Sequence, residues 1–508
     1  MNTDAGKCLL ASSPKNFFSN NQRRYKEHSV TSASPRFSTL EHWLSWLETI
    51  HPCEIDLGLT RIRIVADRMG IGTKPSNGAP LVTVAGTNGK GSFVASMQQL
   101  LSTSDKHVGT YTSPHILKYN ERIQIDGISV TDSEICNAFV AIDRARLDGD
   151  SISLTYFEFS TLAALKIFDD KNLDVWVLEV GLGGRLDAVN IMDADVAVVT
   201  SIAVDHEKWL GNTRELIAIE KAGIIREAAY VVCADFNPPH TLIEKIDDKT
   251  DKSYFISRDF DFRADHLNTS EKDFRSTYRL SVDNIDLSFD KRPNLPLPSI
   301  AAAVQVYCLL NRFFNLACFK TDTFKSVNLI KEHFSNIIPN LCLAGRFEYM
   351  TINGVNVILD VAHNPAAAEH LALRLKETLQ QDITIINRMF SCLCAMMEDK
   401  DNEAVFAHIM PFVEGMFCSE IPDFHRSAGY MDLKKSVENV IEENRLPLVS
   451  SALEKPSQNV HAIQNFEEAL LEGLEHAKKN KQWLLIFGSF YTVALAKQLF
   501  SEKLATKQ

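Results

Sequence analysis

The residues best suited to chemistry form a glycine-rich segment, Gly86-Thr87-Asn88-Gly89-Lys90-Gly91-Ser92. An apolar run, Leu81–Ala85, precedes it and a helical pattern follows from Lys90 onward, so we expect a strand, a tight turn and a helix. Glycines allow backbone N–H groups to face a phosphate, and the helix N-terminus adds partial positive charge. Lys90 would neutralise phosphate oxygens, while the hydroxyl of Ser92 comes one position later than in the usual G-x-x-x-x-G-K-S/T pattern. The segment therefore predicts a site for a nucleoside triphosphate.

Strands alternate with helices on both sides of this turn. Further strands are expected at Asp174–Val180, Asp195–Ile202 and Tyr230–Ala234, with helices at Tyr156–Phe168 and Thr213–Ile225. Such alternation is typical of βαβ units and a mostly parallel sheet. We therefore predict an α/β fold in which a P-loop domain with a parallel sheet carries the turn.

A second α/β alternation starts near Gly345, after a break at Asn336–Ala344 where Pro339 interrupts the pattern. Its expected elements are a helix at Pro365–Leu379 and strands at Val355–Val361, Ile383–Ile386 and Leu484–Phe487. Residues 240–295 are more polar and alternate over short pieces, which favours a β-rich appendage. We thus expect a P-loop domain at residues 37–340 and a smaller Rossmann-like α/β domain at residues 345–508.

Composition narrows the classes of partner. The 508 residues contain 53 Lys or Arg and 65 Asp or Glu, a formal net charge of −12, which disfavours nucleic acid and anionic membranes as partners. The first 36 residues differ, with six basic against two acidic side chains and no periodicity, and are expected to form a disordered arm. They lack the apolar core of a secretory signal, and no window of 18 apolar residues predicts a membrane span. The ten scattered cysteines favour reduced thiols and a cytoplasmic location.

Longer strings around the turn resemble, in order, the folylpolyglutamate synthase/dihydrofolate synthase family, a branch of the Mur-type ATP-dependent amide ligases. The matching strings are Thr83–Ser92 (TVAGTNGKGS), Thr112–Arg122 (TSPHILKYNER), Glu179–Asn190 (EVGLGGRLDAVN), Thr200–Trp209 (TSIAVDHEKW), Glu220–Ile224 (EKAGI), Gly345–Phe347 (GRF), Asp360–Pro365 (DVAHNP) and Gly488–Val493 (GSFYTV). The resemblance runs from Leu40 to Leu499, and the strings DLGLTR (56–61) and SLTYFE (153–158) are most similar to the bifunctional bacterial form.

The resemblance implies an enzyme that adds L-glutamate to dihydropteroate and to the γ-carboxylate of reduced folates. ATP would convert the carboxylate to an acyl phosphate, which the glutamate amine attacks, and two Mg²⁺ ions would screen the anions. Expected partners are these small molecules alone, with no nucleic acid and no membrane, and we expect a monomer.

The resemblance also implies metal ligands. Ser113 and Glu179 would hold one Mg²⁺, and His206 would hold a second with the help of Lys221 if that lysine is carbamylated. Two of these positions also suit the chemistry, because His206 follows a strand and a carboxylate ending a buried strand, as Glu179 does, is costly without a cation. The alternative for Lys221 is an ordinary surface lysine paired with Glu220.

The nucleotide site implied by the resemblance spans both domains. Besides Thr87, Asn88, Gly89, Lys90, Gly91 and Ser92, it would include Ser299, Arg346, Asp360 and His363. Lys90, His206, Lys221 and Arg346 are the expected catalytic residues. Ser299 stands where the family commonly has Asn beside the adenine, so base selectivity is expected to differ more than phosphate binding.

Three segments are candidates for binding the pterin-bearing substrate: Asp56, Leu57, Gly58, Leu59 and Arg61; Thr155, Tyr156, Phe157 and Glu158; and Leu186, Asp187 and Ala188. Phe157 could stack on a flat heterocycle, and Asp187 could pair with its N–H groups. The alternative is that Tyr156, Phe157 and Phe159 simply begin a helix and belong to the core. Near D-K-D (399–401), Cys394, Ala395 and the loop His425-Arg426-Ser427 depart from the family pattern, which bears on how glutamate is placed.

Three other functions remain open from the sequence. A folylpolyglutamate synthase without dihydropteroate activity would fail to hydrolyse ATP in the presence of dihydropteroate and glutamate. A peptidoglycan-precursor Mur ligase is disfavoured by the two strings DLGLTR and SLTYFE. A P-loop switch or binding ATPase would hydrolyse nucleotide without forming an amide.

Overall fold

The computed structural model describes residues 36–53, 55–102, 106–268, 274–314, 316, 324–381, 389–443 and 459–504. Apart from Arg36, the predicted N-terminal arm lies outside the described residues, and so does the strand expected at Ile383–Ile386. No helix in the described part of the chain is long and apolar enough to cross a membrane.

Among the described residues, the first sheet has eight strands in the order β4-β3-β2-β5-β1-β6-β7-β8. They are β1 (Leu81–Ala85), β2 (Val108–Tyr111), β3 (Ile123–Ile125), β4 (Ile128–Ser129), β5 (Val175–Glu179), β6 (Val196–Val199), β7 (Tyr230–Cys233) and β8 (Ser253–Phe255). The strands from β2 to β8 in this order are parallel, while β3 and β4 add an antiparallel edge. The predicted parallel sheet is confirmed, and β1 lies at its centre.

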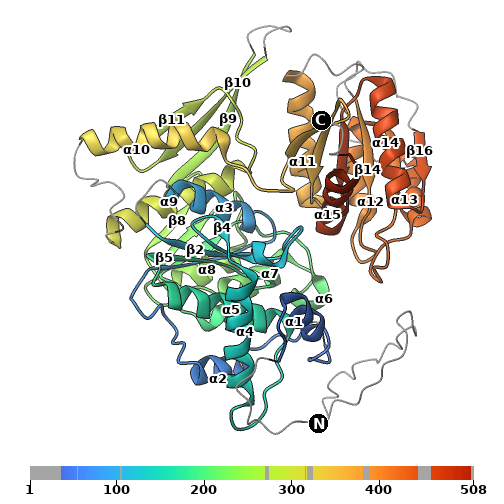
Figure 1. Cartoon of the computed structure of the whole chain (residues 1–508). Coiled ribbons are helices and arrows are strands. Elements are labelled where there is room, and N and C mark those ends of the chain that lie inside the picture. Colours follow the sequence, from blue (N-terminus) through green and yellow to red (C-terminus); the bar gives the residue numbers. More distant parts are fainter. Residues whose placement is uncertain are drawn as a thin grey trace, which may run out of the picture. The chain divides into compact units, whose positions relative to one another are not determined.

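Helices cover both faces of this sheet (Figure 1). One face packs on α3 (Lys90–Leu101) and α9 (Leu297–Phe313), and the other on α4 (Asp132–Leu147), α5 (Tyr156–Lys171), α7 (Arg214–Ala222) and α8 (His240–Asp247). Alternate residues of one strand serve the two faces, since Val82 and Leu81 belong to different cores. The remaining helices here are α1 (Leu40–Leu47), α2 (Thr60–Arg68), α6 (Glu207–Leu210), α10 (Phe324–Ile337) and the 3₁₀ turns η1 (Tyr119–Arg122), η2 (Ala188–Ile191) and η3 (Ile338–Asn340).

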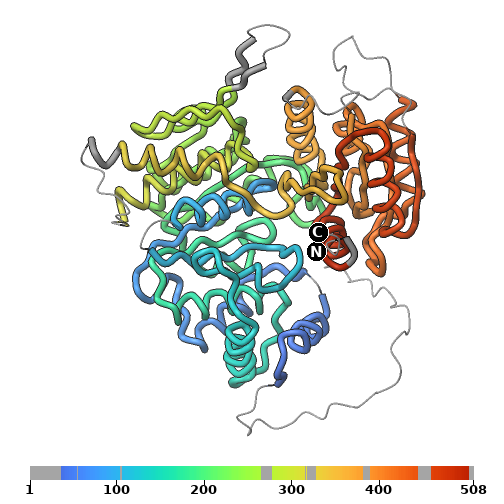
Figure 2. Tube along the Cα trace, turned by 45° about the horizontal axis from the view of Figure 1, so that its top comes forward, coloured from blue at the N-terminus to red at the C-terminus, as the bar shows by residue number. Residues whose placement is uncertain are grey.

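The prediction of a β-rich appendage over residues 240–295 is wrong for its first part. Residues 240–247 form α8, and β8 joins the first sheet beside β7. Only β9 (Phe260–Asn268), β10 (Phe274–Val282) and β11 (Ile285–Phe289) form the separate antiparallel sheet, seen in yellow-green in Figure 2. The error arises because an eight-residue helix and a three-residue strand give too few periods to be distinguished from short alternating pieces.

The second sheet has six strands among the described residues, in the order β12-β13-β17-β14-β15-β16. They are β12 (Glu348–Ile352), β13 (Val355–Asp360), β14 (Phe390–Cys394), β15 (Val413–Cys418), β16 (Asn459–Ala462) and β17 (Leu484–Phe487). All pairs are parallel except β12 with β13. One core includes residues of α11 (Pro365–Gln381), α12 (Asn402–Ile409) and α13 (Tyr430–Glu442), and the other includes residues of α14 (Phe466–Asn480) and α15 (Phe490–Leu499). The turns η5 (Met410–Phe412) and η6 (Phe500–Leu504) complete this part, which we call the C-terminal unit.

Candidate active site

The glycine-rich segment turns between β1 and α3, as predicted. Gly89 has φ 90°, in the left-handed region, and a Cβ there would lie 2.6 Å from Ser299 Oγ, so glycine is required on both grounds. Lys90 begins α3, and its Nζ donates to the carbonyl oxygen of Gly86 at 3.0 Å, which folds the ammonium back over the turn. The first N–H groups of α3 have no acceptor within the helix, so the turn offers donors and a cation to one ligand.

The end of β6 fixes the shape of this turn. The hydroxyls of Thr200 and Ser201 donate to the carbonyl oxygen of Asn88 at 2.7 and 3.0 Å, and the N–H of Thr87 donates to the Ser201 carbonyl at 2.7 Å. From α9, the buried hydroxyl of Ser299 donates to the Gly89 carbonyl at 3.2 Å. Ser299 therefore lies directly against the turn. A longer side chain at this position would extend further from α9 than the serine hydroxyl does.

A buried carboxylate and an unpartnered hydroxyl lie beside the start of α3. Glu179, the last residue of β5, is 4% exposed and accepts from the backbone N–H of Ser113 at 3.3 Å. Burial raises the pKa of Glu179 to about 7, although the charge of Lys90 and the Ser113 N–H oppose the shift. The hydroxyl of Ser92 is buried without a hydrogen-bond partner, and a Cβ at Gly91 would lie 3.6 Å from Glu179 Oε2.

These oxygens fit a hard divalent cation. An orphaned hydroxyl and a desolvated carboxylate each gain from Mg²⁺, which binds oxygen ligands and keeps several waters. No three His, Cys, Asp or Glu side chains gather into a cation site in the part of the chain that the structure describes. A metal here would therefore share its coordination sphere with phosphate oxygens and water.

His206 lies on the loop after β6, where the charges of Lys400 and His363 from the C-terminal unit act on it. It precedes α6 in the left-handed conformation (φ 54°), and its backbone N–H donates to Oδ1 of Asp205 at 2.8 Å. Burial lowers the pKa of His206 to about 4, outweighing the attraction of Asp205, so the ring is neutral at pH 7, the form that binds metals.

Asp205 connects this loop to the C-terminal unit. Its Oδ1 accepts from Lys400 Nζ at 2.6 Å, and its Oδ2 accepts from Asn364 Nδ2 at 3.1 Å. Burial favours the neutral acid, but His206 and Lys400 outweigh it and hold the pKa of Asp205 well below its usual range. Asn364 also exchanges hydrogen bonds of 3.1 Å with the amide of Asn88 in the glycine-rich turn.

Lys221 is buried rather than exposed. It is 4% exposed on α7, and burial together with the charge of Lys90 lowers its pKa to about 7. The alternative of a surface lysine paired with Glu220 is wrong, because Glu220 pairs with Arg185 at 2.9 Å. Within the described residues Lys221 has no carboxylate within 4 Å of its ammonium.

The start of the C-terminal unit supplies Arg346, Asp360 and His363. Asp360 ends β13 and accepts from the N–H groups of Phe347 and Ala362 at 2.9 and 2.8 Å. The Arg346 guanidinium lies 5.0 Å from the centre of the Phe490 ring, and burial lowers its pKa. His363 lies close to Asp205, with 3.9 Å between Nε2 and Oδ2, and burial lowers its pKa to about 4.

Two of the three segments proposed for the pterin-bearing substrate come together through Arg61. Its NH1 donates to Asp56 Oδ2 at 2.7 Å and its NH2 to Glu158 Oε1 at 3.2 Å. Thr155 and Glu158 cap α5 reciprocally, with their side chains accepting from each other's N–H groups at 3.1 and 2.7 Å. Leu57, Gly58 and Leu59 are half-buried between these ends.

Two of the aromatic residues are only partly buried, although they pack against the core. Phe159 belongs to the core, but Tyr156 and Phe157 are only half-buried, and a Cβ at Gly181 would lie 2.6 Å from the tip of the Phe157 ring. Asp187 is buried and accepts from the N–H groups of Leu182 and Val189, each at 2.9 Å. It therefore shapes the turn between Leu186 and Ala188, and burial raises its pKa to about 6.

Sequence reasoning did not single out Asp205, Asn364 or Lys400 as site residues. Asp205 and Asn364 stand inside matching strings, next to His206 and His363, so their positions carried a signal. The only sequence signal for Lys400 was its place in the D-K-D pattern, because its partner Asp205 is 195 residues away.

Two family models match the chain: the Mur ligase middle domain over residues 84–290 and the Mur ligase, glutamate ligase domain over residues 345–490. The dihydrofolate synthase/folylpolyglutamate synthase of Escherichia coli K12 is 38% identical over 386 residues, covering 76% of this chain and 82% of that protein. The chain belongs to the dihydrofolate synthase/folylpolyglutamate synthase family.

Solved members of this family share the architecture. E. coli FolC in complex with DHPP and ADP has a TM-score of 0.72 and 32% identity, covering 91% of this chain and 98% of that one. A bifunctional family member with Mn, AMPPNP and L-glutamate bound also has a TM-score of 0.72, with 30% identity over 92% of this chain and 100% of that one. The family assignment and the α/β fold with its Mur-type parts confirm the resemblance and the fold class given above.

Proposed function

We propose that this chain is an ATP- and Mg²⁺-dependent ligase that joins the amine of L-glutamate to the carboxylate of dihydropteroate and to the γ-carboxylate of reduced folates. The observation that carries the proposal is the group at the start of α3: the Lys90 ammonium, the orphaned Ser92 hydroxyl and the buried Glu179 carboxyl group, on which the charge of Lys90 acts. The complexes of family members with ADP and DHPP, and with Mn, AMPPNP and L-glutamate, support it.

In this mechanism the turn from Gly86 to Ser92 and Lys90 bind the nucleotide phosphates, and Arg346 reaches them from the C-terminal unit. The substrate carboxylate attacks the γ-phosphoryl group, ADP leaves, and an acyl phosphate forms. The neutral glutamate amine then attacks the acyl carbon, and the tetrahedral intermediate expels phosphate. The acyl phosphate must be protected from water. The contacts Asn88–Asn364 and Asp205–Lys400 hold the C-terminal unit against the glycine-rich turn and the loop after β6, which helps to exclude water.

Bound Mg²⁺ would neutralise the phosphate charges that oppose the approach of the carboxylate. Ser92, Ser113 and Glu179 would hold one ion, and His206 with a carbamylated Lys221 a second. A pKa near 7 leaves much of Lys221 neutral and able to react with carbon dioxide. Restoration of Lys221→Ala activity by a small carboxylate would support this modification, and full wild-type activity in bicarbonate-free buffer would contradict it.

The deciding assay offers the purified protein ATP, Mg²⁺ and glutamate with either dihydropteroate or tetrahydrofolate, and resolves the products by mass. We expect an amide product from both acceptors. Product from tetrahydrofolate alone would identify a monofunctional folylpolyglutamate synthase. Nucleotide hydrolysis without amide would favour a switch ATPase, and turnover with neither acceptor would overturn the proposal. We further propose a monomer with domains at residues 37–340 and 345–508, which sedimentation and limited proteolysis would test.

A further inference from the structure

Arg122 lies at the edge of the nucleotide site without a role in the mechanism above. It ends η1, and its carbonyl oxygen accepts from the N–H of Thr112 at 2.9 Å, directly after β2. Ser113, which follows Thr112, donates its backbone N–H to the Glu179 carboxyl. Arg122 is therefore held at the carboxyl end of β2, beside the strand that ends in Glu179, and its charge acts on the Glu179 carboxyl.

Most of the Arg122 side chain is buried, but its guanidinium has no anion in the part of the chain that the structure describes. The residue is 9% exposed, and its Cζ lies 5.6 and 5.7 Å from the ring centres of Tyr119 and Tyr156. Its Nε donates to Nδ1 of His115 at 2.9 Å. This contact requires an unprotonated Nδ1 on a neutral ring, so His115 provides no negative charge for Arg122. Across the described residues, no carboxylate lies within 4 Å of Arg122, and its two terminal nitrogens have no hydrogen-bond acceptor.

Arg146 shows what a buried arginine with a purely structural role looks like in the same chain. It is 8% exposed and lies 5.2 Å from the ring centre of Trp46, much as Arg122 lies near its tyrosines. Arg146, however, pairs with Asp143 at 2.7 Å. The terminal nitrogens of Arg122, by contrast, have no carboxylate partner among the described residues and are free to bind an anion.

We propose that Arg122 binds the reacting carboxylate of the pterin-bearing substrate through its two terminal nitrogens. This inference rests on the proposed function. The planar fork of arginine matches the two oxygens of a carboxylate. Tyr156, one of the candidate pterin-binding residues, lies beside the guanidinium, and the charge of Arg122 acts on the Glu179 carboxyl at the nucleotide site. A carboxylate held there would present an oxygen to the γ-phosphate, and Arg122 would fix its orientation before phosphoryl transfer.

The test compares Arg122→Gln and Arg122→Lys with Arg146→Gln as the matched control. Calorimetry measures the Kd for dihydropteroate on protein saturated with ADP and Mg²⁺, and steady-state kinetics measures KM for ATP. Loss of a bidentate charged contact is expected to raise the Kd of Arg122→Gln about 30- to 150-fold, with KM for ATP within about twofold. Arg122→Lys keeps the charge without the fork, so a smaller increase of about tenfold is expected.

Stability separates binding from folding. Arg122→Gln breaks no ion pair and is expected to leave Tm unchanged, whereas Arg146→Gln leaves Asp143 buried and lowers Tm without changing the Kd. A wild-type Kd retained in Arg122→Gln would overturn the inference. So would weakened binding of tetrahydrofolate alone, because the arginine would then hold the non-reacting α-carboxylate. The proposed function is tested by a different outcome from the Arg122 inference. It fails if the wild type binds dihydropteroate yet forms no amide.

Discussion

The two edges of the first sheet differ in how their charges are balanced, because the carboxyl edge holds unpaired buried charges beside pairs such as Arg214 with Asp235. At the amino edge, charged side chains are paired: Lys74 with Asp195, Arg226 with Asp193, and Lys106 with Asp174 at 3.4 Å. At the carboxyl edge, Glu179, Lys221 and Arg122 are each more than nine-tenths buried, yet within the described residues none has an opposite charge within 4 Å. A paired charge is balanced by its partner within the protein. An unpaired buried charge is balanced only when a ligand or a metal ion of opposite charge binds.

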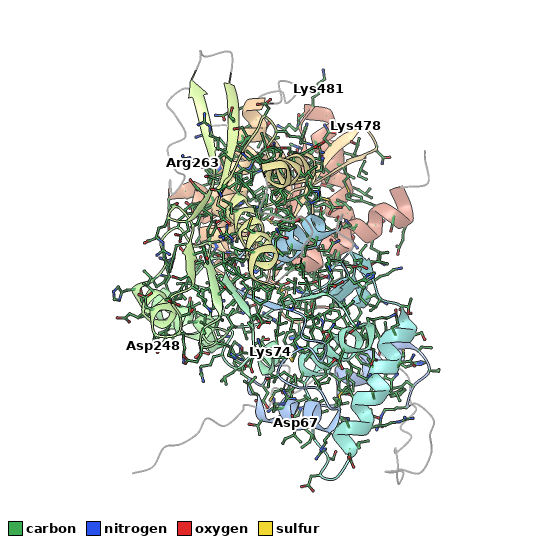
Figure 3. The ribbon with its side chains drawn as sticks, turned by 90° about the vertical axis from the view of Figure 1, so that its left-hand side faces the viewer. Asp67, Lys74, Asp248, Arg263, Lys478 and Lys481 are labelled. Atoms are coloured by element: carbon green, nitrogen blue, oxygen red, sulfur yellow. The ribbon has the colours of Figure 1, made fainter. Side chains whose placement is uncertain are left out.

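A cavity at the amino edge illustrates the difference. A cavity of about 590 Å³ lies at the amino edge, lined by Lys74 (labelled in Figure 3), Asp195, Tyr230 and Lys252 among others. Its acids and bases already neutralise one another, and Lys252 donates to the Ala228 carbonyl at 3.2 Å. The unsatisfied charge, rather than the empty space, marks the edge where an anionic substrate and a metal would bind.

The largest contrast between the edges is expected from their lysines. Lys90→Ala should lower kcat about 100- to 1,000-fold and weaken ATP binding, because it removes the cation held over the phosphate-binding turn. Lys74→Ala breaks a pair that is partly exposed, so kcat and KM should stay within about twofold. Steady-state kinetics and nucleotide titration measure both. Normal ATP binding by a folded Lys90→Ala protein would break the comparison.

A smaller effect is expected at the amino edge, and on stability alone. Asp193→Asn removes the charge that faces Arg226 but leaves Arg226 donating to the carbonyl oxygens of Asn190, Met192 and Gly223. The free energy of unfolding should fall by about 1 kcal/mol or less in urea, with kcat/KM unchanged. A fivefold loss of activity without a loss of stability would place this edge in the catalytic reaction.

The smallest effect concerns the pH dependence of a paired acid on α4. Glu134 pairs with Lys171 at 2.7 Å and accepts from the Thr131 N–H, and these contacts lower its pKa to about 2. A lowered carboxyl pKa stabilises the folded state above the unfolded pKa of 4.5, and this contribution is lost as the pH falls from 4.5 to 2. In Lys171→Met the pKa of Glu134 should rise toward 4.5, as followed by NMR titration of the carboxyl group. An unchanged value would show that the ion pair contributes nothing.

Sequence reasoning worked best where the signal was local. The strand, turn and helix around Lys90 were predicted because an apolar run, three glycines and a helical period occur within 22 consecutive residues. In the second sheet, β13 and β17 were predicted from local apolar runs, whereas β12, β14, β15 and β16 were not located. What the sequence could not show is pairing between distant residues: that Glu220 faces Arg185 rather than Lys221, that Lys400 faces Asp205, and that Arg122 faces no acid. These facts depend on tertiary packing, and they are the ones that separate the two edges.

The central claim is that the buried charges at the carboxyl edge are there for substrates and not for the fold. The most direct measurement is the free energy of unfolding of the wild type and Glu179→Gln in urea, each with and without Mg²⁺ and ATP. We expect the nucleotide-free variant to be at least as stable as the wild type, because glutamine keeps the shape and avoids the cost of ionising a buried carboxyl group that, among the described residues, has no cation within 4 Å. Mg²⁺ and ATP should then stabilise the wild type by about 2 to 3 kcal/mol at 100 times Kd and the variant by less. A nucleotide-free variant that loses about 3 to 5 kcal/mol, as a broken buried ion pair does, would contradict the account.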